Sequence, residues 1–417
     1  MKFGIFYEHQ LPRPWEDGSE HRLMHDALEQ IEIADRIGID HVWEVEHHFL
    51  EEYSHSSAPE VFLAAASQRT SRIRLGHGIV ALPPGYNHPA RVAERIATLD
   101  IVSNGRVELG TGETSSNIEL DGFGVARSQK REQWAEALDV LTRLFVEEPF
   151  AGYDGRFVSM PPRNLVPKPV QRPHPPLWVA CSRRETIHLA AEKGIGALSF
   201  AFVESGEARA FVDDYYATLA SKACVPAGFS VNPNVAVVLP FMLDRDETRA
   251  IDKGLDGAHF FAYSLGHYYI YGSHRPGRTD VWKEFEERRS SVGFDRSIAS
   301  QVGGVLGARL WSEGNLSSAL RGAIGTPDQV RQLLREYAGV GVDEVILVGQ
   351  CGRNRHEDIC ESLEMFGAEI LPELAAAEPE REARKSERLA EAVAAALGRR
   401  SARREVEPEA VEAASLA

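Results

Sequence analysis

Residues 40–49 read DHVWEVEHHF, so an apolar, strand-like segment runs directly into a group of ionisable side chains. A helical pattern precedes it over residues 22–37, and Gly38 stands where helices commonly end. Before that helix, residues 3–7 have the pattern of a buried strand. The start of the chain therefore predicts a strand–helix–strand unit whose second strand ends in charged residues.

The same unit recurs along the chain. Further apolar segments with a strand pattern lie at residues 73–81, 107–110, 177–180, 197–200, 235–242 and 344–348. Helical stretches separate them, and strands that alternate with helices form a parallel sheet. About eight such units predict an α/β fold of the closed (β/α)8 type, a TIM barrel. An open doubly wound sheet is disfavoured, because no strand precedes the glycine fingerprint of a dinucleotide site.

Two segments fall outside this repeat, so we divide the chain into a barrel over residues 1–375 and a tail over residues 376–417. Within the barrel, residues 259–325 form an insertion rich in aromatic residues and glycine, near the C-terminal strands. It is either an extra packed helix or a lid over the mouth. The tail is dense in Ala, Glu and Arg and predicts a solvated helical or disordered appendage, or else a partner-binding segment.

Composition narrows the class of protein. The net charge of −16 argues against binding to nucleic acid or to an acidic membrane, which both require concentrated positive charge. The four cysteines form no C-x-x-C pair, so neither a zinc site nor a redox motif is indicated. So few thiols, no signal peptide pattern and no long apolar run predict a soluble, cytoplasmic protein.

Three stretches carry a family resemblance: MKFGIF at residues 1–6, VWEVEHHF at 42–49 and IVALP at 79–83. Weaker matches are GRVELG at residues 105–110, FG at 123–124, ACS at 180–182 and GTP at 325–327. Together they resemble the bacterial luciferase-like family, whose central members are two-component flavin monooxygenases. The resemblance covers about residues 1–375, and EHHF is its most specific part.

The resemblance implies a set of site residues. His47 matches the family's active-site histidine beside the flavin, and His48 is its neighbour. Gly78–Ile79 falls where the family has a cis, non-proline peptide under the flavin ring. The positions assigned to flavin binding are Gly78, Ile79, Gly110, Arg131, Cys181, Ser182 and Phe200.

Several of these residue types make chemical sense without the resemblance. A phosphomonoester needs several donors, and Arg131 at a helix start and Ser182 between a strand and a helix could provide them. The alternatives are a surface arginine for Arg131 and a helix N-cap for Ser182. Cys181 is expected to be a buried packing residue whose backbone N–H faces the phosphate, and Phe200 to lie near the flavin ring.

The two adjacent histidines should point to opposite sides of their strand, so only one enters the barrel mouth. A histidine pair is more often structural, but the C-terminal end of a barrel strand is where catalytic groups lie. No H-x-H or H-E-x-x-H pattern completes a metal site, so we expect no metal. We expect His47, with a near-neutral pKa, to act as a general base, and His48 to face the packed side.

The sequence departs from the luciferase pattern at two positions. Gly112 stands where luciferase has a reactive cysteine, and Glu113 stands where it has an arginine near the phosphate. These differences disfavour light emission but leave oxygen chemistry open.

The resemblance implies that reduced FMN, supplied by a separate flavin reductase, reacts with O2 to give a flavin hydroperoxide. This would oxygenate a small organic substrate such as an aldehyde or ketone, while the insertion keeps water out. The alternatives are a deazaflavin-dependent oxidoreductase of the same superfamily and a non-catalytic flavin-binding barrel. Because family members commonly pair, we expect a homodimer.

Overall fold

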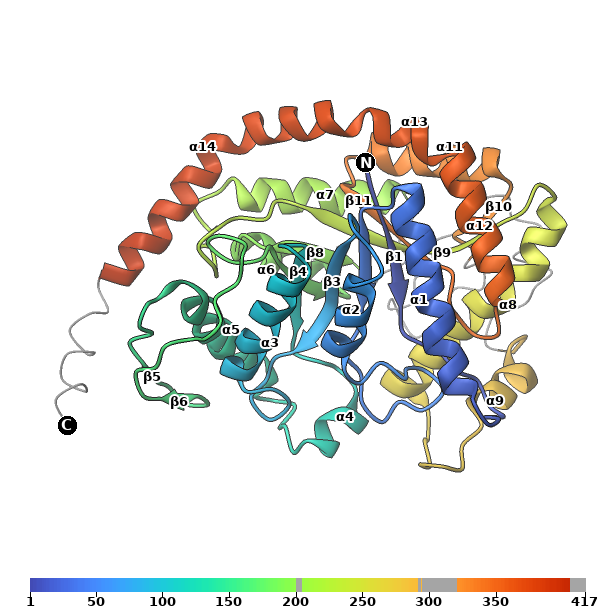
Figure 1. The fold of residues 1–417 in the computed structure, drawn as a ribbon, viewed down its shortest axis with the longest axis horizontal. Coiled ribbons are helices and arrows are strands. Elements are labelled where there is room, and N and C mark those ends of the chain that lie inside the picture. The colour runs from blue at the N-terminus through green and yellow to red at the C-terminus, as the bar shows by residue number, and fades with distance from the viewer. Residues whose placement is uncertain (200–204, 292–293, 295–320, 406–417) are drawn as a thin grey trace.

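The computed structural model of the chain describes residues 1–199, 205–291, 294 and 321–405 (Figure 1). Its main sheet is built from β1 (Lys2–Tyr7), β2 (His41–Glu44), β3 (Arg74–Ala81), β4 (Val107–Gly112), β7 (Leu177–Cys181), β8 (Gly196–Ser199), β9 (Val235–Leu243) and β11 (Glu344–Val348). Neighbouring strands pair in parallel in this order, and β11 pairs with β1 to close the ring. The predicted TIM barrel is confirmed.

Three short strands lie outside the ring. β10 (Ala323–Gly325) pairs in parallel with the end of β9, and β5 (Tyr153–Asp154) pairs with β6 (Ser159–Met160) as a small antiparallel hairpin. The hairpin lies in the long connection between α5 and β7.

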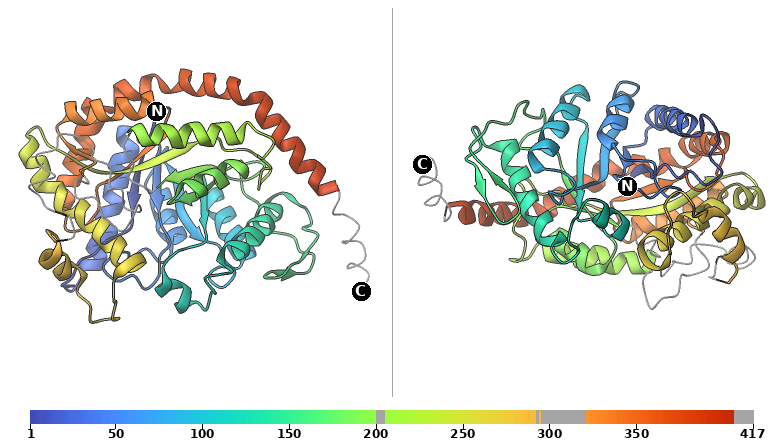
Figure 2. Two further views of the ribbon diagram at one scale, coloured as in Figure 1. Left: turned by 180° about the vertical axis from the view of Figure 1, so that it is seen from behind. Right: turned by 90° about the horizontal axis from the view of Figure 1, so that it is seen from below.

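Helices surround the strands, as Figure 2 shows from two further sides. The helices of the first half are α1 (Ser19–Ile37), α2 (Pro59–Ser67), α3 (Pro89–Val102), α4 (Asn117–Gly122) and α5 (Lys130–Val146). The next are α6 (Arg184–Glu192), α7 (Ser205–Leu219), α8 (Glu247–Gly266), the π-helical turn η1 (His267–Tyr271) and α9 (Val281–Arg288). The last are α11 (Pro327–Gly339), α12 (His356–Glu369), α13 (Leu371–Ala376) and α14 (Glu378–Glu405). None of the helices in the described ranges is long and apolar enough to cross a bilayer.

Local sequence explains where several of these helices begin and end. Gly38 ends α1 in the left-handed region with a φ of 105°, a conformation that glycine adopts without strain. Pro59 and Pro327 open α2 and α11, where the missing N–H of proline has no helical partner to lose. Thr326 and Gln329 form a capping box at the start of α11.

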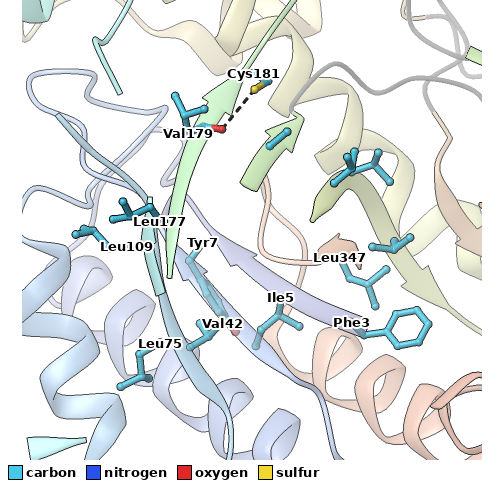
Figure 3. Close-up of a cluster of buried hydrophobic side chains, with 14 of the residues drawn as sticks. Phe3, Ile5, Tyr7, Val42, Leu75, Leu109, Leu177, Val179, Cys181 and Leu347 are labelled. Carbon is cyan, nitrogen blue, oxygen red and sulfur yellow. Dashed lines mark hydrogen bonds between the residues drawn. The ribbon is translucent and has the colours of Figure 1, made fainter. Parts of the chain in front are cut away.

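The strands are buried on both faces and separate two apolar layers. Side chains that point outward, including those of Phe3, Ile5 and Tyr7, pack against the helices (Figure 3). Inward-pointing side chains such as Phe6 and Trp43 belong to a second cluster within the barrel. This two-sided burial explains why the strands read as near-continuous apolar runs.

The aromatic segment that begins in the second half of α8 is packed over its described part. Phe260, Tyr263, Trp282 and Phe285 are buried in the inner cluster with the strand residues. The helix itself begins at Glu247, upstream of the expected insertion, and continues into the π-helical turn. The remaining part of the expected insertion lies largely outside the described residues.

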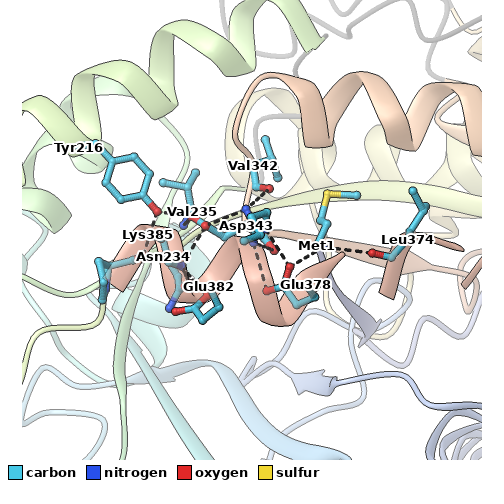
Figure 4. A network of polar contacts seen from close by, with 12 residues as sticks. Met1, Tyr216, Asn234, Val235, Val342, Asp343, Leu374, Glu378, Glu382 and Lys385 are labelled. Atoms are coloured by element: carbon cyan, nitrogen blue, oxygen red, sulfur yellow. Dashed lines mark hydrogen bonds and ion pairs between the residues drawn. The ribbon is translucent and has the colours of Figure 1, made fainter. Parts of the chain in front are cut away.

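The C-terminal helix α14 packs against the barrel rather than extending into solvent. It runs along the edge at which the N-terminus lies (Figure 1), and Leu389 and Ala396 on it are buried. Lys385 Nζ donates to Asp343 Oδ1 at 3.0 Å and to Asn234 Oδ1 at 2.7 Å (Figure 4). Because those acceptors directly precede β11 and β9, the helix covers the amino-terminal end of the barrel.

These contacts correct the expectation of a solvated tail. Few apolar residues of α14 are buried, but its charged side chains have buried partners. Arg381 donates to the backbone oxygen of Asp343 at 3.0 Å, and Arg399 donates to that of Cys224 at 2.8 Å. The composition of the segment predicted exposure because a sequence does not show which charges are paired.

We predict that Lys385→Met lowers the free energy of unfolding by about 1–3 kcal/mol, because the change removes a charged donor from buried acceptors. Arg384→Met is the matched control, since Arg384 pairs with Glu380 on the exposed side of the same helix. Denaturant unfolding measures both variants. Equal stabilities for the two would show that α14 contributes little to the fold.

Candidate functional site

A cavity of about 240 Å³ opens at the carboxyl ends of the barrel strands. Its walls come from the ends of β1, β2, β3, β4 and β7, the starts of α5 and α6, and the end of α8. The residues that line it include Glu8, Val45, Glu46, His47, Tyr53, Gly78, Ile79, Gly112, Glu113, Thr114, Arg127, Val179, Ser182, Arg183, Phe261, Leu265 and Tyr269. This is the end at which barrel enzymes carry out their chemistry.

His47 lies between two carboxylates in this cavity. Its Nδ1 is 3.0 Å from Glu119 Oε1, and its Nε2 is 3.6 Å from Glu8 Oε2. The hydroxyl of Tyr269 is 3.3 Å from His47 Nδ1 and 3.4 Å from Nε2. Three elements far apart in the chain, β1, α4 and η1, thus bring ionisable groups to one imidazole ring.

The two carboxylates decide the charge of His47. Burial disfavours the imidazolium, but the charges of Glu119 and Glu8 outweigh it and raise the pKa of His47 to about 9. His47 is therefore protonated at neutral pH, and the expectation of a near-neutral base is wrong. The side chain is a cation and a hydrogen-bond donor.

Glu8 and Glu119 respond to the shared environment in opposite directions. Burial raises the pKa of Glu8 to about 7, although the charge of His47 and a hydrogen bond from Tyr53 act against the rise. Burial also acts on Glu119, but His47 and three further hydrogen bonds lower its pKa below the ordinary value. Glu8 is thus the group whose charge changes near neutral pH.

Each carboxylate is held in place by other donors. Tyr53 donates its hydroxyl to Glu8 Oε1 at 2.9 Å, while Glu8 Oε2 is buried without a hydrogen bond. Glu119 accepts the backbone N–H of His48 at 2.9 Å and the hydroxyl of Thr114 at 2.8 Å. Glu119 is therefore fully paired, whereas one oxygen of Glu8 is available to a ligand.

His48 does not line the cavity. Its Nε2 is 3.1 Å from Glu46 Oε1, and its ring packs edge-on against Phe123 with the centroids 4.8 Å apart. Glu46 in turn accepts from the backbone of Ala81 and the amide of Asn87, so it ties β2 to β3. His47 thus lines the cavity and His48 does not, although both lie beyond the end of β2 and not within the strand as expected.

Gly78 and Ile79 line the cavity, and β3 is irregular there. Its register with β4 shifts between His77 and Val80. The cis peptide bonds of the described residues all precede proline, so the Gly78–Ile79 bond is trans and the expectation of a cis bond is wrong. The strand accommodates the bend through the register shift instead.

Gly110, also expected to bind the flavin, lies beneath the cavity wall rather than on it. A Cβ atom at this position would be 2.1 Å from the backbone oxygen of His77, so only glycine permits the close approach of β4 to the irregular part of β3. Gly112, at the end of the same strand, does line the cavity.

Basic residues gather on the side of the cavity formed by α5 and α6. The pKa of Lys130 is lowered by burial and also by the nearby charges of Arg127, Arg131 and Arg183. Arg127 and Arg183 line the cavity together with Ser182, whereas the expected Arg131 does not line it, is 55 % exposed and pairs with Glu113. The donors fit an anion such as a phosphomonoester.

The other two expected flavin residues are placed differently. Cys181 is fully buried, its thiol contacts the backbone oxygen of Val179 at 3.5 Å (Figure 3), and burial raises the pKa of the thiol to about 12. It is an unreactive packing residue, as expected. Phe200 lies outside the described residues.

Glu8, Glu119, Tyr53 and Tyr269 were not found from the sequence. Glu8 directly follows β1, so the rule that drew attention to His47 at the end of β2 also applied to it. The contact between His47 and Glu119 spans 72 positions of the chain and left no local pattern. In the part of the chain that the structure describes, no three His, Cys, Asp or Glu side chains form a candidate metal site.

The sequence pattern of the luciferase-like monooxygenase family matches residues 1–344. The chain belongs to that family. Among curated relatives, this luciferase-like chain is 39% identical over 150 residues to limonene 1,2-monooxygenase of Rhodococcus erythropolis, covering 36% of this chain and 37% of the relative. It is 28% identical over 198 residues to the oxygenase component of flavin-dependent trigonelline monooxygenase of Acinetobacter baylyi. That match covers 46% of this chain and 52% of the relative.

The matched stretches span about half the length of two further curated relatives from Sinorhizobium fredii, 48% and 54%. Among solved structures, the chain superposes on monooxygenase RslO1 of Streptomyces bottropensis with a TM-score of 0.68 and 26% identity, over 90% of this chain and all of that one. Two similar folds at 18% identity are an FMN complex of the oxygenating constituent of 3,6-diketocamphane monooxygenase of Pseudomonas putida (TM-score 0.66) and an F420-dependent secondary alcohol dehydrogenase (TM-score 0.64). Each covers 89% of this chain and has 98% of its own length covered. The family and the fold are thus shown.

We predict that Glu119→Gln lowers the pKa of His47 by more than about one unit, because the change removes the larger of the two charges that favour the imidazolium. The pH titration of the His47 ring by NMR measures the shift. Glu20→Gln, beside His55, is the control and should leave His47 unchanged. An unshifted His47 in Glu119→Gln would show that the ring is not in contact with this carboxylate.

Proposed function

We propose that this protein is a flavin-dependent monooxygenase that uses reduced FMN and O2 to oxygenate a small organic substrate such as an aldehyde or ketone. The observation that carries the proposal is a single cavity that joins the His47 cluster to a cluster of basic residues. A cofactor with a reactive ring system at one end and a phosphate at the other requires both clusters.

The residues of the cavity fit a flavin. Ile79, Val179, Phe261 and Leu265 supply apolar walls, as a flat aromatic ring requires. A Cβ atom at Gly112 would be 2.6 Å from Ile79 Cδ1, so the glycine lets Ile79 pack closely against the end of β4. Arg127, Arg183 and Ser182 would hold the phosphate, with Arg131 nearby.

When bound, reduced FMN would activate O2 and supply the electrons, so that one oxygen atom enters the substrate and the other leaves as water. The residues of the chain would control charge, protons and water around that reaction. The protonated His47 would donate a hydrogen bond to negative charge that develops beside it. Tyr53 is buried and Tyr269 half-buried at that end of the cavity, where the two rings would limit the access of water.

Glu8 is the proton acceptor that the geometry favours. Its Oε2 has no hydrogen-bond donor, and its pKa of about 7 leaves half of the molecules ionised at neutral pH. His47 cannot accept a proton under these conditions, because it already carries one. The division of roles gives Glu8 the proton transfer and His47 the stabilisation of charge.

The names of relatives support the reaction class and suggest a partner. The trigonelline enzyme is the oxygenase component of a flavin-dependent monooxygenase, which supports a separate flavin reductase as a partner here. The limonene enzyme acts on an apolar molecule by name, in agreement with the apolar side of this cavity. We further propose a cytoplasmic homodimer.

The proposed function is tested by supplying reduced FMN, isotopically labelled O2 and a panel of aldehydes and ketones, with a flavin reductase present. We expect one labelled oxygen atom in the product. Turnover with a reduced deazaflavin and no incorporation of label would support the deazaflavin-dependent oxidoreductase instead. Binding of FMN with neither product would indicate a non-catalytic flavin-binding barrel.

We predict that Arg131→Ala weakens the binding of FMN by about tenfold or more while riboflavin, which lacks the phosphate, binds nearly as before. Quenching of flavin fluorescence measures both affinities. Arg156→Ala is the control, because Arg156 pairs with the exposed Glu132. Equal losses for the two flavins would show that Arg131 has only a structural role.

We predict a bell-shaped dependence of turnover on pH, falling below about pH 7 as Glu8 is protonated and above about pH 9 as His47 loses its proton. His47→Ala should lower turnover by about 10²–10⁴-fold and remove the alkaline limb, whereas Glu8→Gln should remove the acidic limb. If His47→Ala lost the acidic limb and Glu8→Gln left the pH profile unchanged, the roles of the two residues would be the reverse of those proposed. His48→Ala should lower stability more than turnover.

A further inference from the structure

Glu113 is a carboxylate among the basic residues that would receive the flavin phosphate. Its Oε1 accepts from Arg131 Nη2 at 2.9 Å and from Nε at 3.3 Å. Its Oε2 is buried, has no hydrogen bond and lies 3.8 Å from Lys130 Nζ. Glu113 lines the same cavity as Arg127 and Arg183.

The carboxylate pairs with Arg131 but is not required to position Lys130 and Arg127. Lys130 Nζ donates to the backbone oxygen of Thr114 at 2.5 Å, and Arg127 Nη1 donates to that of Ser115 at 3.1 Å. These anchors come from backbone atoms of the loop between β4 and α4, so they would remain without Glu113. Its effect on the cluster is one of charge.

We propose that Glu113 is a specificity-determining residue that occupies the anion subsite in the free protein and lowers its affinity for the phosphate of the cofactor. This inference rests on the proposed flavin site. A bound phosphate must either displace Glu113 from Arg131 and Lys130 or remain beside its negative charge. Both alternatives weaken the binding of FMN, and neither affects a flavin without a phosphate.

The effect suits a cofactor that is exchanged in each cycle. In the proposed reaction, FMN arrives reduced from a separate enzyme and must leave oxidised to be reduced again. Four cations without a counter-charge would hold the phosphate in both states. Glu113 reduces that attraction while Arg127, Lys130, Arg131 and Arg183 still attract the anion.

The test is an equilibrium titration of the wild type and of Glu113→Gln and Glu113→Ala with oxidised FMN, riboflavin and inorganic phosphate. We expect both variants to bind FMN about tenfold more tightly and riboflavin unchanged. Inorganic phosphate, titrated without FMN, should also bind the variants more tightly than the wild type. Glu132→Gln, on the exposed side of α5, is the control and should match the wild type.

The contrary outcomes separate this inference from the proposed function. FMN binding that is unchanged or weaker in both Glu113 variants would overturn the role of Glu113 and leave the flavin site in place. An equal gain for FMN and riboflavin would overturn it as well, since the phosphate would not be involved. Failure of the wild type and of both variants to bind FMN at all would overturn both proposals.

Discussion

The interior of the barrel must be filled, and two tryptophans fill most of it. Trp43 on β2 and Trp178 on β7 meet edge to face, with their ring centroids 5.2 Å apart. A Cβ atom at Gly76 would be 2.3 Å from Cε3 of Trp43, and one at Gly196 would be 2.3 Å from Cε3 of Trp178, so only glycine fits beside each ring. The indole N–H groups donate to the buried Glu344 and Glu108 at 2.8 and 2.7 Å. The cavity can therefore open only beyond this layer, towards the carboxyl ends of the strands.

The sequence predicted this architecture because closed parallel barrels have a strong local signature. Strands such as β9, buried along its whole length, read as apolar runs, and each must be followed by a helix before the next parallel strand. It also predicted that only one of the adjacent His47 and His48 enters the cavity. These features depend on neighbouring residues alone.

The parts that were not predicted depend on contacts between distant residues. The charge of His47 is set by Glu8 and Glu119, which reach it from other elements, so the pKa could not be inferred from the histidine and its neighbours. The same holds for α14, where the sequence does not distinguish Lys385 from the other basic residues, although it alone among those described donates hydrogen bonds to Asp343 and Asn234 together.

The two ends of the cavity differ in charge, and this difference would orient a ligand. At the His47 end, Glu8 and Glu119 place up to two negative charges beside one imidazolium. At the α5 and α6 end, four basic residues outnumber the single carboxylate of Glu113. An anionic group is attracted to the second end and repelled from the first, and burial strengthens both effects. A ligand with one anionic end and a neutral ring would therefore bind in one direction, with the ring against the apolar walls and towards His47.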